Sequence, residues 1–265
     1  MNCFKTLSLS TTLSLAAALI ASATAWADSP FDGTWTLNTA KSHLAGDTMT
    51  LKDEGGGTLS YEDSDQTYTF KPDGTPFTTP FGVERTFKQA GDGKYEFSNK
   101  RNGSVISTGT WTVSADAKKI VIDSKGTKPN GDQFENKVTF MRTGTGTGLA
   151  GTWTSTAVKL SSPNTLTLQT EGKDDVTLTI SAIKASCKAK WDGKEYPVAG
   201  PTVPDGLTLA LRKTGPDSFK VVERVKTKVL AIARYKVAAD DKTMTEHVTN
   251  GAGKEPQTEV WEKQS

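Results

Sequence analysis

The chain has very few of the side chains that carry acid–base, nucleophilic or metal chemistry near neutral pH. Its 265 residues include 2 histidines and 2 cysteines. Cys3 lies in an N-terminal stretch that has the composition of a leader, so Cys187 would be the one cysteine of the mature chain. No intrachain disulfide can then form, although exported domains often carry them. Histidines and cysteines this sparse match no zinc-ligand spacing. The sequence therefore predicts no disulfide framework, no metal site and no cofactor.

Long apolar runs and an excess of one charge are also missing. After the N-terminal stretch, no segment approaches the ~20 consecutive apolar residues of a membrane helix. The chain has 32 Lys+Arg against 30 Asp+Glu, and the lysines are scattered along it. Nucleic acid and insertion into a membrane are therefore not expected. Phosphate-binding loops, dinucleotide motifs and nucleophile elbows are absent too, so no common catalytic motif points to an enzyme.

The N-terminal stretch is typical of a secretory signal peptide. Lys5 supplies a positive charge, residues 13–20 (LSLAAALI) form a short apolar run, and Ala25-Trp26-Ala27 offers small residues at the two positions that a signal peptidase reads. We expect residues 1–27 to be removed, which leaves a mature protein in the periplasm or the external medium.

The mature chain alternates apolar and polar residues with a period of two. In Leu207, Leu209 and Leu211, for example, every second residue is apolar and the residues between are Thr208 and Ala210. Alternate side chains of a strand point to opposite faces, so this pattern is typical of antiparallel sheets with one buried face. Asn-Gly and Asp-Gly pairs between the runs supply the positive φ angles of tight hairpins. The sequence therefore predicts an all-β protein.

Short motifs recur in the same order in the two halves of the chain. Phe31-Asp-Gly-Thr-Trp35 returns as Leu149-Ala-Gly-Thr-Trp153, and Trp111-Thr-Val-Ser-Ala-Asp116 returns as Tyr235-Lys-Val-Ala-Ala-Asp240. Their common order indicates an internal duplication. We expect repeat 1 at residues 28–142, a Gly/Thr linker at 143–148 and repeat 2 at 149–265. Each repeat could close into a β-barrel or pack as a β-sandwich, because both satisfy the alternation.

The Gly-x-Trp motifs that end at Trp35 and Trp153 resemble the opening motif of lipocalins, and residues 33–42, 191–201 and 241–245 are similar to bacterial exported lipocalin-like proteins. The resemblance implies two tandem antiparallel barrels. In the family, an arginine near the last strand covers the tryptophan. This implies a contact of Arg142 with Trp35, by a cation–π interaction, and Lys263 occupies the comparable place in repeat 2. The barrel-closure residues expected on this basis are Trp35, Arg142, Trp153, Trp261 and Lys263.

The remaining candidates for catalysis are weak. His247 follows Glu246 in an expected strand, so the two side chains should face opposite sides of the sheet and cannot act as a pair. His43 is expected in a loop. Cys187 shares strand parity with Ala185 and Ala189, which indicates a buried and inert thiol.

Aromatic residues in expected strands are the candidates for ligand binding, with ordinary core packing as the alternative. They are Tyr68, Phe70, Trp111, Trp191 and Tyr235. Export, duplication and the missing catalytic groups lead to an exported, non-catalytic binding protein for a small apolar ligand. The alternative is a structural or protein-interaction module of the cell envelope with filled barrels. An enzyme ranks third, and a cavity with clustered, desolvated ionisable groups would favour it.

Overall fold

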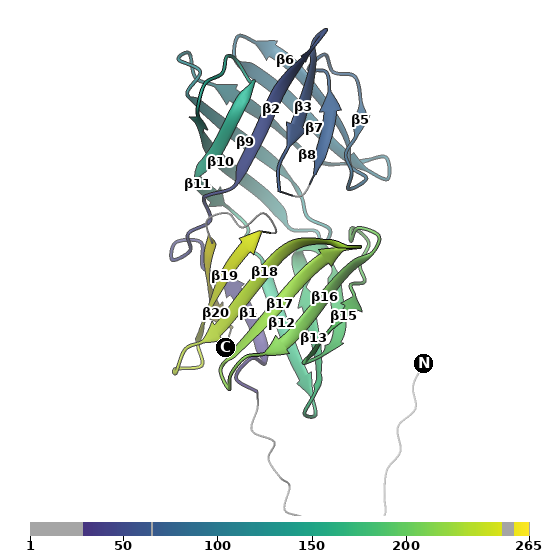
Figure 1. Ribbon diagram of the computed structural model, residues 1–265, viewed down its shortest axis with the longest axis vertical. Helices are drawn as coiled ribbons and strands as arrows, with labels where there is room; N and C mark the ends of the chain where they lie inside the picture. The colour runs from purple at the N-terminus through teal and green to yellow at the C-terminus, as the bar shows by residue number, and fades with distance from the viewer. Residues whose placement is uncertain (1–28, 65, 251–256, 265) are drawn as a thin grey trace, which may run out of the picture.

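The computed structural model describes residues 29–64, 66–250 and 257–264, and these residues are almost entirely strands. The single helical element among them is a short 3-10 helix, η1 (Ser181–Ile183), so no helix of the described residues has the length and hydropathy to cross a membrane. The expected signal peptide, 1–27, lies outside the described residues. The strands form two antiparallel ten-stranded sheets, which confirms the all-β prediction. Figure 1 shows that the two sheets are stacked along the long axis of the molecule.

Barrel 1, the upper sheet in Figure 1, is built from ten strands that follow one another in the chain. Its strands are β2 (Thr48–Gly55), β3 (Thr58–Glu62), β4 (Thr67–Phe70), β5 (Phe77–Thr78), β6 (Glu84–Gly91), β7 (Lys94–Arg101), β8 (Ser104–Val113), β9 (Lys119–Thr127), β10 (Gln133–Thr143) and β11 (Gly151–Leu160). The order of pairing is β4-β3-β2-β11-β10-β9-β8-β7-β6-β5. The two end strands are brought together by the rings of Phe70 and Phe77, whose centroids are 5.2 Å apart.

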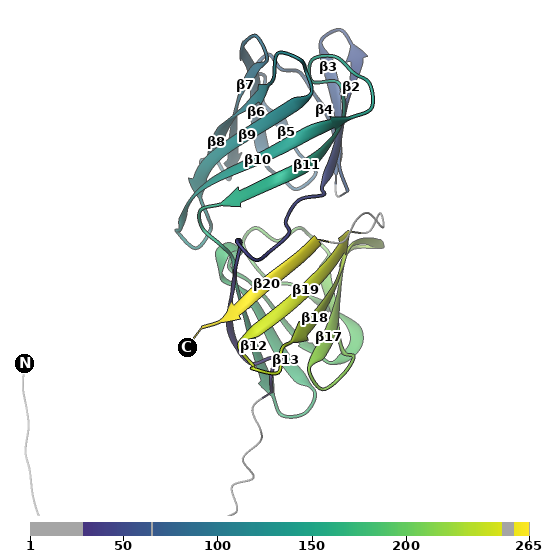
Figure 2. The same cartoon turned by 90° about the vertical axis from the view of Figure 1, so that its left-hand side faces the viewer.

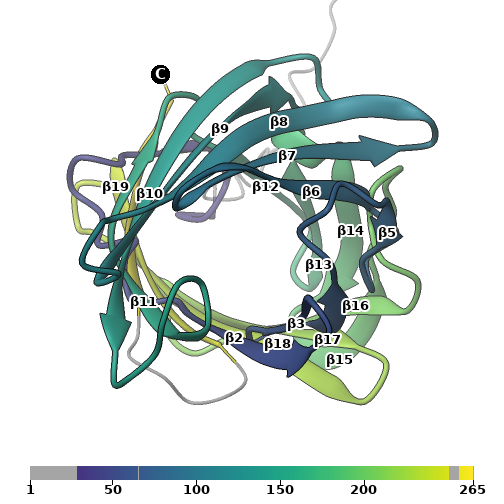
Figure 3. The ribbon, with the colours of Figure 1, turned by 90° about the horizontal axis from the view of Figure 1, so that it is seen from above.

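Barrel 2 combines the first strand of the chain with the strands of its second half. Its strands are β1 (Gly33–Leu37), β12 (Thr165–Glu171), β13 (Asp175–Ile180), β14 (Ala185–Lys190), β15 (Asp192–Pro197), β16 (Leu207–Lys213), β17 (Ser218–Val225), β18 (Lys228–Val237), β19 (Thr243–Asn250) and β20 (Gln257–Lys263). An isolated bridge between Ser186 and Ala199 joins the two ends of this sheet. Each barrel is one continuous hydrogen-bonded sheet that curls into a ring (Figure 3), so the barrel interpretation holds and the two-sheet sandwich does not.

The first strand of each repeat lies in the barrel of the other repeat. Strand β1 of repeat 1 pairs with β12 and β20 in barrel 2, and strand β11 of repeat 2 pairs with β2 and β10 in barrel 1. Residues 48–160 therefore contain every strand of barrel 1, and they are inserted between β1 and β12 of barrel 2. The repeats expected at 28–142 and 149–265 describe the duplication. The barrels divide the chain differently, because barrel 1 is formed by residues 48–160 and barrel 2 by β1 together with β12 to β20.

The segment 143–148 is not a linker between barrels. It belongs to the turn that joins β10 to β11, two neighbouring strands of barrel 1. The backbone N–H of Ala150 donates to the carbonyl of Thr147 across this turn, at 3.0 Å. Glycine and threonine suit a hairpin turn as well as a linker, so composition alone did not separate the two. Residues 38–47 and 161–164 make the two passages between the barrels, and Figure 2 shows the first passage as the purple trace.

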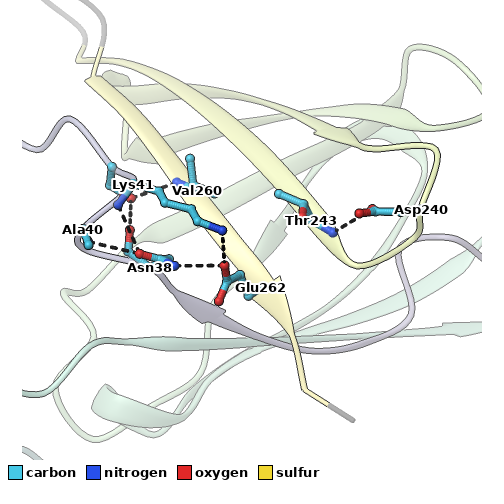
Figure 4. Close-up of polar contacts among 8 residues, drawn as sticks. Asn38, Ala40, Lys41, Asp240, Thr243, Val260 and Glu262 are labelled. Atoms are coloured by element: carbon cyan, nitrogen blue, oxygen red, sulfur yellow. Dashed lines mark hydrogen bonds and ion pairs between the residues drawn. The ribbon is translucent and has the colours of Figure 1, made fainter.

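The passage 38–47 is held against the last strand, β20, by side chains of the motif at residues 33–42 (Figure 4). The side-chain oxygen of Asn38 accepts from the backbone N–H of Lys41 at 3.1 Å, and its amide nitrogen donates to Glu262 at 2.9 Å. Lys41 forms an ion pair with Glu262 at 2.8 Å. The hydroxyl of Ser42 donates to the carbonyl of Asn38 and accepts from the N–H of Val260. This motif therefore fixes the chain where it leaves barrel 2.

Candidate functional site

The two Gly-x-Trp motifs make the same contacts, one in each barrel. Trp35 in barrel 2 and Trp153 in barrel 1 are both fully buried. The indole N–H of Trp35 donates to the carbonyl of Phe31, and that of Trp153 donates to the carbonyl of Leu149, each at 2.9 Å. A buried indole N–H needs such a partner. The duplication seen in the sequence is thus repeated in hydrogen-bond geometry.

The cations that cover these tryptophans differ from the expected pairs. The Arg142 guanidinium lies 4.0 Å from the ring centroid of Trp153, and the Lys263 ammonium lies 5.1 Å from that of Trp35. The predicted contact of Arg142 with Trp35 is therefore wrong. The physical reason is that the two repeats exchange their first strands. Strand β10, which carries Arg142, therefore pairs with β11, which carries Trp153. Strand β20, which carries Lys263, pairs with β1, which carries Trp35.

The five aromatic residues expected to line a ligand cavity do not come together. Tyr68, Phe70 and Trp111 lie in barrel 1, whereas Trp191 and Tyr235 lie in barrel 2. All but Tyr68 are at most 9% exposed. Each packs against other rings of its own barrel. The contacting pairs are Tyr68–Tyr61, Tyr68–Phe77, Phe70–Phe87, Phe87–Trp111, Trp191–Phe31, Trp191–Phe219 and Phe219–Tyr235, with centroids 4.4–5.6 Å apart. The arrangement is that of aromatic core packing.

Barrel 2 contains an ionisable group that the sequence reasoning missed. Glu246 in β19 is 6% exposed, and its carboxylate accepts a hydrogen bond from the indole N–H of Trp261 at 2.9 Å. Tyr235 is a second hydrogen-bond partner. The pKa of Glu246 is raised to about 8, chiefly by burial and also by the carboxylates of Glu259 and Glu223. Burial also raises the pKa of Glu259. Glu246 is therefore largely protonated at neutral pH.

Barrel 1 has no counterpart of this acidic cluster. In barrel 2, Glu246 pairs in register with Tyr235 on one side and with Glu259 on the other. At the same place in barrel 1, Ile122 pairs with Trp111 and Val138, so both carboxyl positions hold apolar residues. The signal was present in the sequence, because Glu246 has the inward parity of the apolar residues two positions before and after it in β19. A protonated carboxyl has the chemistry of a general acid, but the hydrogen bonds of Glu246 go to the core residues Tyr235 and Trp261. The geometry supports a structural role.

The other reactive side chains are placed as expected. His247 is exposed on the outer face, where its ring contacts the Thr258 hydroxyl at 3.1 Å, so it is on the face opposite Glu246. Cys187 is fully buried, and burial raises the pKa of its thiol to about 11. His43 lies in the passage between the barrels, with its backbone paired to Thr258. Over the described part of the chain, no group of three or more His, Cys, Asp or Glu is arranged to hold a metal ion.

A cleft of about 760 Å³ lies where the two barrels meet. Barrel 1 contributes the β7–β8 and β9–β10 hairpins, and barrel 2 contributes η1 and the 201–202 loop. The apolar part of the lining is Val105, Ile106, Pro129, Phe134, Ile183 and Pro201. Val105 is 55% exposed and Ile183 is 38% exposed. They are two of the three exposed large hydrophobic residues of the described chain, and the third, Met141, lies outside the cleft.

Cationic side chains connect the two walls of this cleft. Arg101 of β7 donates to the carbonyl of Thr202 in barrel 2 at 2.9 Å and to that of Phe81 at 3.3 Å. Lys128 donates to the carbonyl of Ser162 at 2.5 Å, in the second passage between the barrels. These bonds hold the two barrels in one arrangement at the cleft. The lining contains no histidine, cysteine or carboxylate.

Comparison of the chain with protein-family models, with curated proteins and with solved structures finds no match.

Proposed function

We propose that the mature chain is an exported, non-catalytic binding protein for a small, largely apolar ligand, which it holds in the cleft between the two barrels. The observation that carries the proposal is the exposure of Val105 and Ile183 to the same hollow. Exposed large apolar side chains that gather in one concave place are typical of a binding site. The volume of about 760 Å³ falls within the range of small-molecule pockets, which often form between domains.

The cleft is a better site than the barrel interiors. The five aromatic residues expected to contact a ligand pack against other rings, and none of them lines the cleft. A second hollow of about 610 Å³ crosses β8–β11, but its lining is almost entirely threonine, serine, asparagine and charged residues. An apolar ligand gains little from such a lining.

The filled barrels also agree with the alternative function, a structural or protein-interaction module of the cell envelope. In that case the exposed apolar residues of the cleft would contact another protein. These residues line one hollow between the two barrels, and a concave lining favours a small ligand over a protein surface.

Native mass spectrometry of the mature protein, purified from its own host, tests the proposal. We expect a bound small molecule that organic extraction removes. The variants Val105→Asp and Ile183→Asp should lose it, because each places a charge on the apolar wall. Met141→Asp is the matched control, since Met141 is about as exposed as Ile183 but lies outside the cleft, and it should retain the ligand. A protein free of ligand, before and after incubation with host lipid extract, would support the interaction module instead.

A further inference from the structure

The charged residues that line the cleft are all of one sign. Its lining contains three cationic residues, Arg101, Lys128 and Lys184, and no aspartate or glutamate. The whole chain is nearly balanced in charge, with 32 basic and 30 acidic residues. Three cations around an apolar hollow with no acid in the lining therefore mark a local excess of positive charge.

None of these three cations forms an ion pair within the described chain. Arg101 donates to backbone carbonyls, and Lys128 donates to the carbonyl of Ser162 and the side-chain oxygen of Asn164. Lys184 follows η1, at a φ of 50°. Burial lowers the pKa of Lys128, and the nearby carboxylate of Asp132 opposes that change. A partly buried ammonium without a paired carboxylate is stabilised when an anion binds to it.

We propose that the ligand of the cleft is an anionic amphiphile with a single apolar chain, such as a long-chain carboxylate. This inference rests on the proposed function and adds the chemistry of the head group. The apolar chain lies on Val105, Ile106 and Ile183, and the carboxylate accepts hydrogen bonds from Lys128 and Lys184. Both walls take part, because Lys128 belongs to barrel 1 and Lys184 to barrel 2. The head group thus joins the two barrels.

Three probes with the same twelve-carbon chain separate the head group from the apolar part. Calorimetric titration of the mature protein would use dodecanoate, dodecanol and dodecylammonium, each below its critical micelle concentration. We expect dodecanoate to bind at least about tenfold more tightly than dodecanol, as charge-assisted hydrogen bonds would give. We expect dodecylammonium to bind most weakly.

Variants of the two lysines locate the head group. Lys128→Gln and Lys184→Gln should each reduce the preference for dodecanoate over dodecanol to about threefold or less, with little change for dodecanol. Lys226→Gln is the matched control, because Lys226 also has a positive φ, 55°, but lies outside the cleft. It should leave the preference unchanged. Circular dichroism of each variant establishes that the barrels are intact.

The outcomes distinguish the two proposals. If none of the three probes binds, the proposed function itself fails. If dodecanoate and dodecanol bind equally, the cleft binds apolar chains but the inference about the head group is wrong. A preference for dodecanoate that survives both lysine variants and their double variant would also overturn the inference, because the anion would then be bound elsewhere.

Discussion

Arg142 lies over the ring of Trp153, with its guanidinium carbon 4.0 Å from the ring centroid, and the two residues pair in register across β10 and β11. The same guanidinium donates to the carbonyls of Ala117, Gly148 and Ala150. One side chain thus fixes the tryptophan, the β8–β9 turn and the β10–β11 turn of barrel 1. In barrel 2, Lys263 occupies this place 5.1 Å from the ring of Trp35, with one ammonium in place of a planar group with several donors.

This difference predicts unequal effects of removing the two cations. Arg142→Ala should lower the free energy of unfolding of barrel 1 by about 2–3 kcal/mol, because it removes a cation–π contact and hydrogen bonds to three carbonyls. Lys263→Ala should cost about 1 kcal/mol in barrel 2. Urea denaturation followed by tryptophan fluorescence measures both changes. Equal losses would show that the hydrogen bonds of Arg142 contribute nothing beyond the ring contact.

The glycine of the second Gly-x-Trp motif should tolerate no side chain. Gly151 has a φ of 145°, and a Cβ atom there would meet the Arg142 guanidinium well inside van der Waals distance. Gly151→Ala should therefore destabilise the protein by about 2 kcal/mol or more, through backbone strain and displacement of Arg142. Gly131→Ala is the control. Gly131 also has a positive φ, 103°, but nothing lies within 4 Å of its Cβ position, so we expect a smaller loss from strain alone. Thermal unfolding of both variants checks the difference.

The insertion of one barrel into the other predicts that each can be produced alone. Residues 45–163 should fold as barrel 1, because they contain all of its strands. Barrel 2 should fold when Asn38 is joined to Asn164 by two glycines, since the backbone N–H of Leu37 already bonds to the carbonyl of Asn164 at 3.0 Å. Size-exclusion chromatography and near-ultraviolet circular dichroism of the two proteins would show native packing. A molten or aggregated barrel 1 would mean that its stability depends on barrel 2.

The buried carboxyl of Glu246 predicts that stability falls as the pH rises. Its pKa in the folded protein is about 8, above the ordinary value of 4.5, so the folded state binds more protons than the unfolded state between these pH values. The stabilisation is complete below about pH 4.5 and is lost as the pH rises through 8. Glu246→Gln keeps an acceptor for Trp261 and carries no charge. At pH 9 it should unfold on the order of 5 °C above the parent protein. At pH 5 the two melting temperatures should nearly coincide, and a constant offset at both pH values would rule out ionisation as the cause.

The strands and the duplication could be predicted from sequence, whereas the assignment of strands to barrels could not. Alternation such as that of Leu207, Leu209 and Leu211 depends only on which face of a strand is buried, so it can be seen locally. The motifs at Gly33 and Gly151 are both followed by Thr-Trp-Thr, so either strand offers the same side chains to either barrel. Pairing preferences therefore do not separate the exchanged arrangement from the simple one.

The candidate site was predictable only in part. Glu246 could have been found as an acidic residue at an inward position of its strand. The cleft could not, because Val105 in β8 and Ile183 in η1 are far apart in sequence and belong to no motif. They share a hollow only because the barrels are stacked. The aromatic residues gave an ambiguous signal, because a core and a ligand cavity use the same residue types.

The insertion of barrel 1 between β1 and β12 also sets the order in which the two barrels can form. Barrel 1 can close as soon as β11 has been made, because its ten strands are consecutive. Strand β1 is made first, yet its partners are β12 and β20, and β20 is the last strand of the chain. During synthesis β1 therefore stays unpaired until β12 has been made, and its second edge stays open until β20 has been made. Barrel 2 is necessarily the later of the two to form, and a nascent chain cut short anywhere before β20 keeps β1 with at least one open edge.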